Sequence, residues 1–103
     1  MQIVPLQAIP NQTFTILLNG ELYRIALRTI QELTYISVWI NEEILFYNQL
    51  CTPNNWVNPY DYVSRNGKFF FACTDEEYPT YTKFNITQQL LFLTTEEVAN
   101  EKA

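Results

Sequence analysis

The chain has 103 residues, of which 16 % are aromatic and 17 % are charged, and its 11 acidic against 6 basic residues leave a net charge of -5. A chain of this length has room for one core, so we expect residues 1–103 to form a single domain. The negative balance repels a phosphate backbone and the basic residues are scattered along the chain, so we expect no nucleic-acid partner.

Residues 1–11 are marked by Pro5 and Pro10 and are expected to form an arm that leads into the domain. This segment lacks the charged start and apolar run of a secretory signal, and no stretch of the chain holds 18 consecutive apolar residues. We therefore expect a protein without a membrane span that is made and kept in a cytoplasm.

The dipeptide Asn19-Gly20 predicts a two-residue type I′ turn, because both central residues of that turn need a positive φ. Such a turn places Leu18 opposite Glu21 and Phe14 opposite Ile25. One face of this hairpin then collects the apolar residues Phe14, Ile16, Leu18, Tyr23, Ile25 and Leu27. The opposite face shows Thr13, Thr15, Leu17, Leu22, Arg24, Ala26 and Arg28. A one-residue slip would turn the apolar face outward.

A second hairpin is predicted from residues 33–40 and 44–50, which are rich in β-branched and aromatic side chains. A three-residue loop, 41–43, would place Ile44 opposite Ile40 and Phe46 opposite Val38. Both faces of this hairpin carry large apolar groups. We expect one face to pack on the core and the other on a second sheet or a neighbouring subunit.

The remaining chain predicts a long loop over residues 52–67, in which Asn66-Gly67 turns the chain into a strand over 68–73. A last strand is expected over residues 86–93. In the tail, residues 94–103, Thr94 and Glu97 are positioned to cap one helical turn, and the tail is expected to fray. These patterns predict an all-β fold: a single small β-barrel or β-sandwich of about six mostly antiparallel strands.

Catalytic and ligand-binding chemistry is poorly represented in the sequence. The chain has no histidine, and with two glycines it cannot build a glycine-rich phosphate loop. Cys51 and Cys73 are interpreted as reduced, buried thiols, and the acidic run 75–77 is interpreted as a solvated turn rather than a metal site. We expect no enzyme activity, no cofactor and no metal.

The aromatic side chains leave two interpretations. The rings of residues 56–62 have the chemistry of a carbohydrate- or receptor-binding face, whereas large rings on strand faces that one thin domain cannot cover are typical of subunit interfaces. We favour the interface interpretation. The candidate interface residues are Trp39, Trp56, Tyr60, Tyr62, Phe70, Tyr78, Tyr81 and Phe84, and the predicted turn residues are Asn19, Gly20, Asn66 and Gly67.

The sequence resembles a family of small phage tail proteins, the baseplate plugs of contractile tails. The N-terminal part of the resemblance is a P-x-Q-x-F pattern, here Pro10, Gln12 and Phe14, that leads into a Leu-rich hairpin with its turn at Asn19-Gly20. The C-terminal part is a Gly-x-Phe strand, here Gly67 and Phe69, followed by the pattern P-x-Y-x-x-F and an apolar strand, here Pro79, Tyr81, Phe84 and residues 90–93. Asn85 departs from the pattern, which has glycine after the phenylalanine, but asparagine tolerates the left-handed conformation.

The resemblance implies a non-enzymatic protein of the virion, assembled in the host cytoplasm, that sits in the baseplate near the tail axis. It also implies a homo-oligomeric ring whose neighbours are the hub, the spike and the tail-tube proteins.

Overall fold

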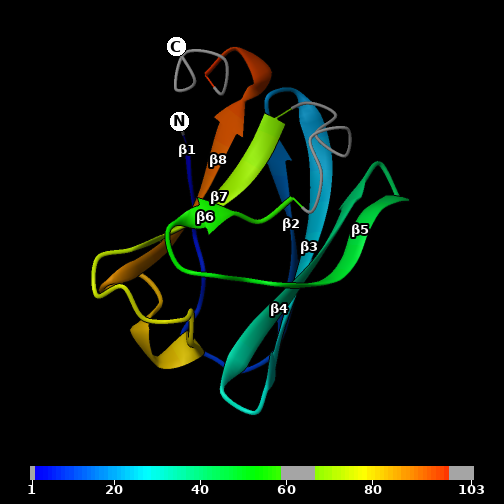
Figure 1. The fold of residues 1–103 in the computed structure, drawn as a ribbon. Helices are drawn as coiled ribbons and strands as arrows, with labels where there is room; N and C mark the ends of the chain where they lie inside the picture. Colours follow the sequence, from blue (N-terminus) through cyan, green and yellow to red (C-terminus); the bar gives the residue numbers. More distant parts are fainter. Residues whose placement is uncertain (1, 59–66, 98–103) are drawn as a thin grey trace.

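The computed structural model describes residues 2–58 and 67–97, and these residues form two antiparallel sheets of four strands each. One sheet has the order β1-β8-β7-β6 and the other has the order β2-β3-β4-β5 (Figure 1). The strands are β1 (Gln2–Val4), β2 (Gln12–Leu18), β3 (Glu21–Ile30), β4 (Leu33–Ile40), β5 (Glu43–Leu50), β6 (Asn55–Trp56), β7 (Gly67–Cys73) and β8 (Gln88–Thr94). The all-β prediction is confirmed, and the described strands form two separate sheets rather than one closed sheet.

The first predicted hairpin is confirmed in its turn and in its register. Asn19 and Gly20 have φ values of 48° and 82°, as a type I′ turn requires. Leu18 pairs with Glu21 and Phe14 pairs with Ile25. The face that was expected to point inward is buried or packed against the core.

The predicted second hairpin forms, but its turn is shorter than expected. Asn41 and Glu42 both have a positive φ and make a two-residue turn, so Ile40 pairs with Glu43 and not with Ile44. Phe46 nevertheless lies opposite Val38, because β5 contains an extra residue between Ile44 and Phe46. Such a β-bulge restores the inward direction of Phe46 after a one-residue difference in the turn.

Two strands were not predicted, and both are short. β1 lies inside the segment expected to be a lead-in arm and pairs with β8, and the paired residues are 86 to 90 positions apart in the chain. β6 lies inside the expected long loop and pairs with β7. Asn58 strengthens this contact, because its side-chain oxygen accepts a hydrogen bond from the Phe69 N–H at 2.8 Å.

Gly67 begins β7 rather than serving as a positive-φ turn residue, and its partner in the predicted turn, Asn66, lies outside the described residues. A Cβ at Gly67 would lie 2.3 Å from the main-chain oxygen of Leu93 and 2.6 Å from Cζ of Phe92. A glycine is therefore needed here for close packing against β8.

The core lies between the two sheets and is centred on three aromatic rings. Tyr23 packs edge-to-face against Phe69 at 5.7 Å and against Phe92 at 5.5 Å between ring centroids. Cys51 and Cys73 are buried and free, as predicted. Burial raises the pKa of both thiols above the ordinary value, which disfavours the reactive thiolate near neutral pH.

The described C-terminal end has the predicted capping pattern. The Thr94 N–H donates to a Glu97 carboxylate oxygen at 2.9 Å, and the Glu97 N–H donates to the Thr94 hydroxyl at 3.3 Å. This reciprocal pair is a capping box, and it starts one helical turn. The rest of the tail that was expected to fray, residues 98–103, lies outside the described residues.

Candidate interface surfaces

The outer face of the β2-β3-β4-β5 sheet carries an apolar cluster next to the two hairpin turns, and we call it the Trp39 patch. Leu17 and Leu22 face each other across β2 and β3, and Trp39 faces Ile44 across β4 and β5. Tyr47 completes the patch, with its ring centroid 6.4 Å from that of Trp39. Leu17, Tyr47, Ile44 and Leu22 expose 64 %, 62 %, 53 % and 50 % of their surface.

A cation lies against the central ring of this patch. The Arg24 guanidinium carbon is 4.4 Å from the centroid of the Trp39 ring, which is within the range of a cation–π contact. The contact covers part of the Trp39 ring with a cation. A large ring surrounded by exposed apolar side chains has the composition of the centre of a protein interface.

The outer face of the other sheet carries an apolar row that crosses all four strands, and we call it the Phe70 row. Ile3, Leu91, Phe70 and Trp56 follow one another through the pairs of β1 with β8, β8 with β7 and β7 with β6. The Trp56 and Phe70 rings meet edge-to-face at 5.3 Å. Lys68 lies over the Trp56 ring, with Nζ 5.3 Å from its centroid.

The segment between β7 and β8 forms one end of the molecule and is held by the buried side chain of Gln88. The Gln88 side-chain oxygen accepts a hydrogen bond from the Thr80 N–H at 2.9 Å, and its side-chain nitrogen donates to the Tyr78 carbonyl at 3.2 Å. Asn85 has a φ of 65°, which confirms that asparagine adopts the left-handed conformation at this departure from the family pattern. Tyr78 is half exposed on this end.

An ion-pair cluster orders the acidic part of the same segment. The Lys83 ammonium pairs with Glu77 and lies 3.6 Å from the Asp75 carboxylate. The hydrogen bond from the Thr87 hydroxyl, at 2.7 Å, is the main cause that lowers the pKa of Asp75. The Glu77 hydrogen bond is the main cause that raises the pKa of Lys83. The acidic run 75–77 is therefore an ordered turn.

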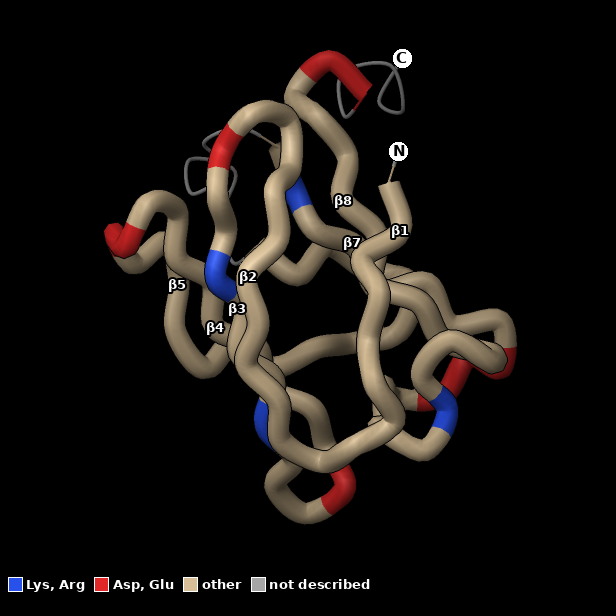
Figure 2. Tube along the Cα trace, turned by 180° about the vertical axis from the view of Figure 1, so that it is seen from behind, with Lys and Arg blue, Asp and Glu red and all other residues tan. Residues whose placement is uncertain are grey.

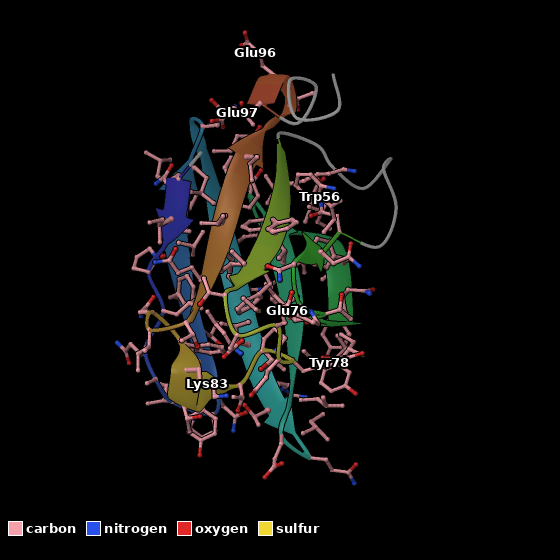
Figure 3. All side chains as sticks on the ribbon, turned by 60° about the vertical axis from the view of Figure 1, so that its left-hand side comes forward. Trp56, Glu76, Tyr78, Lys83, Glu96 and Glu97 are labelled. Atoms are coloured by element: carbon pink, nitrogen blue, oxygen red, sulfur yellow. The ribbon has the colours of Figure 1, made fainter. Side chains whose placement is uncertain are left out.

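The predicted interface residues do not form one site. Trp39 lies on one outer face, and Trp56 and Phe70 lie on the other. Tyr78 lies at the end of the molecule, well away from Trp56 (Figure 3), and Tyr81 belongs to the 3₁₀ turn of the same segment. Phe84 is 3 % exposed and packs on Phe71 in the core, so it contributes to no exposed surface. Tyr60 and Tyr62 lie outside the described residues.

The prediction also omitted four residues that dominate the Trp39 patch: Leu17, Leu22, Ile44 and Tyr47. The signal for two of them was present, because the hairpin register already placed Leu17 and Leu22 on the outward face. Large apolar residues at outward positions are a stronger interface signal than aromatic character alone. The positions of Ile44 and Tyr47 depend on the bulge in β5, which has no clear signature in the sequence.

Apart from Lys83, which pairs with the acidic turn, the charged residues of the described ranges differ in position according to sign. Acidic residues gather at the turns and the ends of the molecule, whereas Arg24, Arg28 and Lys68 lie on strands (Figure 2). Within residues 2–58 and 67–97 no group of three or more acidic or thiol side chains is placed to hold a metal ion. No helix among the described residues is long and apolar enough to cross a membrane.

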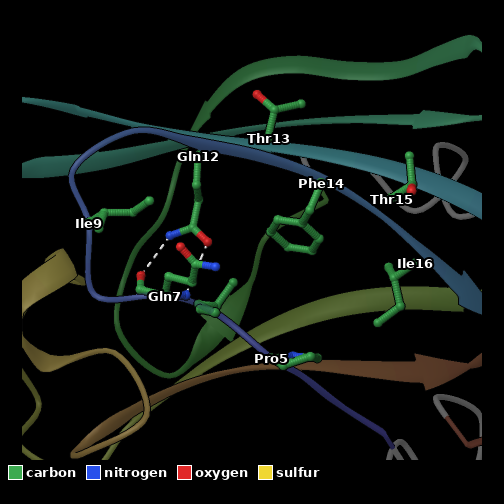
Figure 4. Close-up of a pocket in the computed structure, with 9 residues that line it drawn as sticks. Pro5, Gln7, Ile9, Gln12, Thr13, Phe14, Thr15 and Ile16 are labelled. Carbon is green, nitrogen blue, oxygen red and sulfur yellow. Dashed lines mark hydrogen bonds between the residues drawn. The ribbon is translucent and has the colours of Figure 1, made fainter.

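A groove lies between the N-terminal arm and β2, which forms one edge of its sheet (Figure 4). It has a volume of about 570 Å³ and is lined by Pro5, Leu6, Gln7, Ile9 and residues 12–16. Two hydrogen bonds between Gln7 and Gln12 close one end of the groove, at 2.7 and 3.1 Å. Phe14 and Ile16 are half-buried against its floor.

Comparison with known proteins yields one family. The family model described as cyanophage baseplate Pam3 plug gp18 matches residues 1–96 of the chain. Among individual curated proteins, none matches the chain at a significant level.

Proposed function

This chain belongs to the family of cyanophage baseplate plugs, and its role is that of a structural baseplate component; from this premise we propose that it is a plug-like subunit near the tail axis. In this position it links the end of the tail tube to the hub and spike and acts through its interfaces, without catalysis. Several copies form a ring, and the mature location is the tail of the virion.

The observation that carries the proposal is the presence of two different apolar surfaces on opposite outer faces. Both sheets bury their inner faces in one core, so the Trp39 patch and the Phe70 row point away from each other. In a ring, each copy presents one surface to the copy before it and a different surface to the copy after it. A subunit with two unlike surfaces can make both of these contacts with this single domain.

The charge distribution is compatible with close packing of several negatively charged copies. Each chain has a net charge of -5, and equal charges repel as copies approach. Because the acidic residues of the described ranges lie at turns, strand ends and the ends of the molecule (Figure 2), the middle parts of the outer strand faces carry no carboxylate. Faces of this kind bury apolar area without placing carboxylates against each other.

The carbohydrate-binding alternative is not favoured by the described residues. Sugar stacking needs an open ring face, whereas Lys68 lies over the Trp56 ring and Phe70 packs against this ring in a T-shaped contact. The other rings of that proposed face, Tyr60 and Tyr62, lie outside the described residues.

The proposal is tested by mixing the protein with the hub, spike and tube proteins of the same phage and following co-assembly by light scattering and electron microscopy. We expect particles that contain the wild-type chain. Tyr47→Ser removes an exposed ring from the Trp39 patch and should weaken co-assembly, and Ile3→Ser should do the same for the Phe70 row. Ile86→Ser is the matched control, because Ile86 is 75 % exposed but lies on neither sheet. Failure of the wild-type chain to enter any particle would contradict the proposal.

A further inference from the structure

Three of the four sheet edges carry features that prevent pairing with another strand, and the fourth does not. β1 has three residues and is followed by Pro5, β6 has two residues, and β5 has two register irregularities. These are the usual means by which proteins protect an edge. β2 has seven residues, QTFTILL, with no charge, no proline, no glycine and an unbroken register. A regular, neutral edge of this length is a template for a further strand.

The hydrogen-bonding groups on this edge are identified by the pairing of the neighbouring strands. The Asn41 N–H donates to the Leu22 carbonyl at 3.0 Å, so the main chain of Leu22 faces β4. Its cross-strand partner on β2, Leu17, is therefore a position that does not bond to β3. Thr15 and Thr13 are also positions that do not bond to β3, because the main-chain N–H and C=O groups of successive residues point alternately to the two sides of a strand.

The N–H and C=O groups of Thr13, Thr15 and Leu17 thus point away from the sheet. No residue of the described ranges forms a hydrogen bond with them. Because three donors and three acceptors lie on one line, an incoming antiparallel strand would satisfy all of them with regular ladder bonds. The exposed side chains of these three residues leave this edge accessible.

The groove beside this edge has the chemistry of a strand-binding site. It has no charged residue in its lining and its floor includes the half-buried Phe14 and Ile16. The arm on the other side is held in place, because the Asn85 side chain donates to the Leu6 carbonyl and Gln7 exchanges hydrogen bonds with Gln12. The groove is therefore present before a partner binds.

We propose that the free edge of β2 and the adjoining groove bind an extended, uncharged segment of another baseplate protein. The segment adds a fifth strand next to β2 and places alternate apolar side chains over Phe14 and Ile16. This is recognition by strand addition, in which main-chain hydrogen bonds supply affinity and alternate side chains supply specificity. This inference rests on the proposed baseplate function. It specifies what kind of segment binds at the edge of β2, namely an extended segment without charge.

The donor is a different protein rather than a second copy of this chain. A neutral groove requires a segment without charge, and the uncharged runs of seven or more residues in the described ranges are 2–20, 33–41, 44–58 and 84–95. Each of these runs already contains a paired strand of its own fold. A second copy would keep its own ladder hydrogen bonds only by offering a free edge, and the edges of β1, β5 and β6 are protected. Edge-to-edge pairing of two β2 strands is a two-fold contact, which the proposed head-to-tail ring does not use.

The test compares Thr15→Pro with Thr15→Val in co-assembly with the hub, spike and tube proteins. Proline removes the edge donor and obstructs an incoming strand, whereas it costs no internal bond because the Thr15 N–H points away from β3. Valine keeps the donor and the β-branched shape. We expect the apparent affinity to fall about tenfold or more for Thr15→Pro and to be unchanged for Thr15→Val.

Amide hydrogen exchange of the wild-type chain gives a second readout that does not depend on the folding of a variant. The amides of Thr13, Thr15 and Leu17 should exchange rapidly in the isolated chain and become protected in the assembly, whereas those of Phe14 and Ile16 are already protected.

If the three edge amides stay unprotected in the assembly, or if Thr15→Pro co-assembles like the wild type, the edge inference is overturned and the proposed function stands. Pairing of two copies in solution, seen as a dimer mass that Thr15→Pro abolishes, would overturn the choice of donor. If the wild-type chain enters no assembly, the proposed function falls and this inference falls with it.

Discussion

Replacing Gln88 by leucine should destabilise the domain, because this buried side chain joins the segment after β7 to β8. Leucine has a similar volume but leaves two main-chain groups without partners, the Thr80 N–H and the Tyr78 carbonyl. A buried polar group that loses its partner costs about 1–3 kcal/mol. We therefore expect Gln88→Leu to lower the free energy of unfolding by about 2–4 kcal/mol, a large part of the roughly 5–15 kcal/mol that holds a domain together.

The assay is equilibrium unfolding in urea, followed by the fluorescence of the two tryptophans. Gln89→Leu is the matched control, because Gln89 is the next residue on β8 and points to the outer face. The control should change the free energy of unfolding by less than about 0.5 kcal/mol, as is usual for surface positions. If Gln88→Leu changes it no more than Gln89→Leu, the two hydrogen bonds do not have the role assigned to them.

Three further predictions concern packing, thiol reactivity and pH. Gly67→Ala should lower the free energy of unfolding in urea by about 1–3 kcal/mol, because the added Cβ would lie 2.3 Å from the Leu93 main-chain oxygen; an unchanged midpoint would refute the close packing. Cys51 and Cys73 should not react with a thiol reagent at pH 8 until the protein is unfolded, because burial raises the pKa of both; rapid labelling of the native protein would contradict this. The pKa of Asp75 is lowered in the fold, so its contribution to stability is present above its unfolded pKa and is lost as the pH falls through the folded pKa. Asp75→Asn should therefore make the loss of thermal stability below about pH 4 shallower, and an identical pH profile for both proteins would count against this.

The prediction from sequence was accurate where the signal was local. The register of the first hairpin follows from Asn19-Gly20 together with strict alternation on both sides, and both act over a few residues. The capping of the last helical turn by Thr94 and Glu97 is also a contact across three positions. The wrong prediction at the second hairpin is local as well, because Asn41 and Glu42 close a two-residue turn rather than a three-residue loop and the bulge in β5 is not encoded by one residue type.

The candidate interface could be predicted only in part, because a face is a property of the assembled sheets. Trp39 and Phe70 were correctly expected to point away from the face that is buried. Alternation along one strand shows which residues of that strand share a face. It does not show which residues of other strands lie beside them, because that depends on the order and register of the strands. Phe84 was predicted as an interface residue together with the other rings, and it lies in the core beside Phe71.

The sequence by itself determined an all-β domain, the first hairpin with its register, the absence of histidine chemistry and the family to which the chain belongs. Each of these depends on residue types or on contacts between near neighbours. Only the tertiary structure decided that β1 joins β8, that Gln88 is a buried polar anchor and that the edge of β2 is left open beside a neutral groove. These features arise when segments far apart in the chain meet, and the free energy that selects them comes from burial and from hydrogen bonds that no single segment contains.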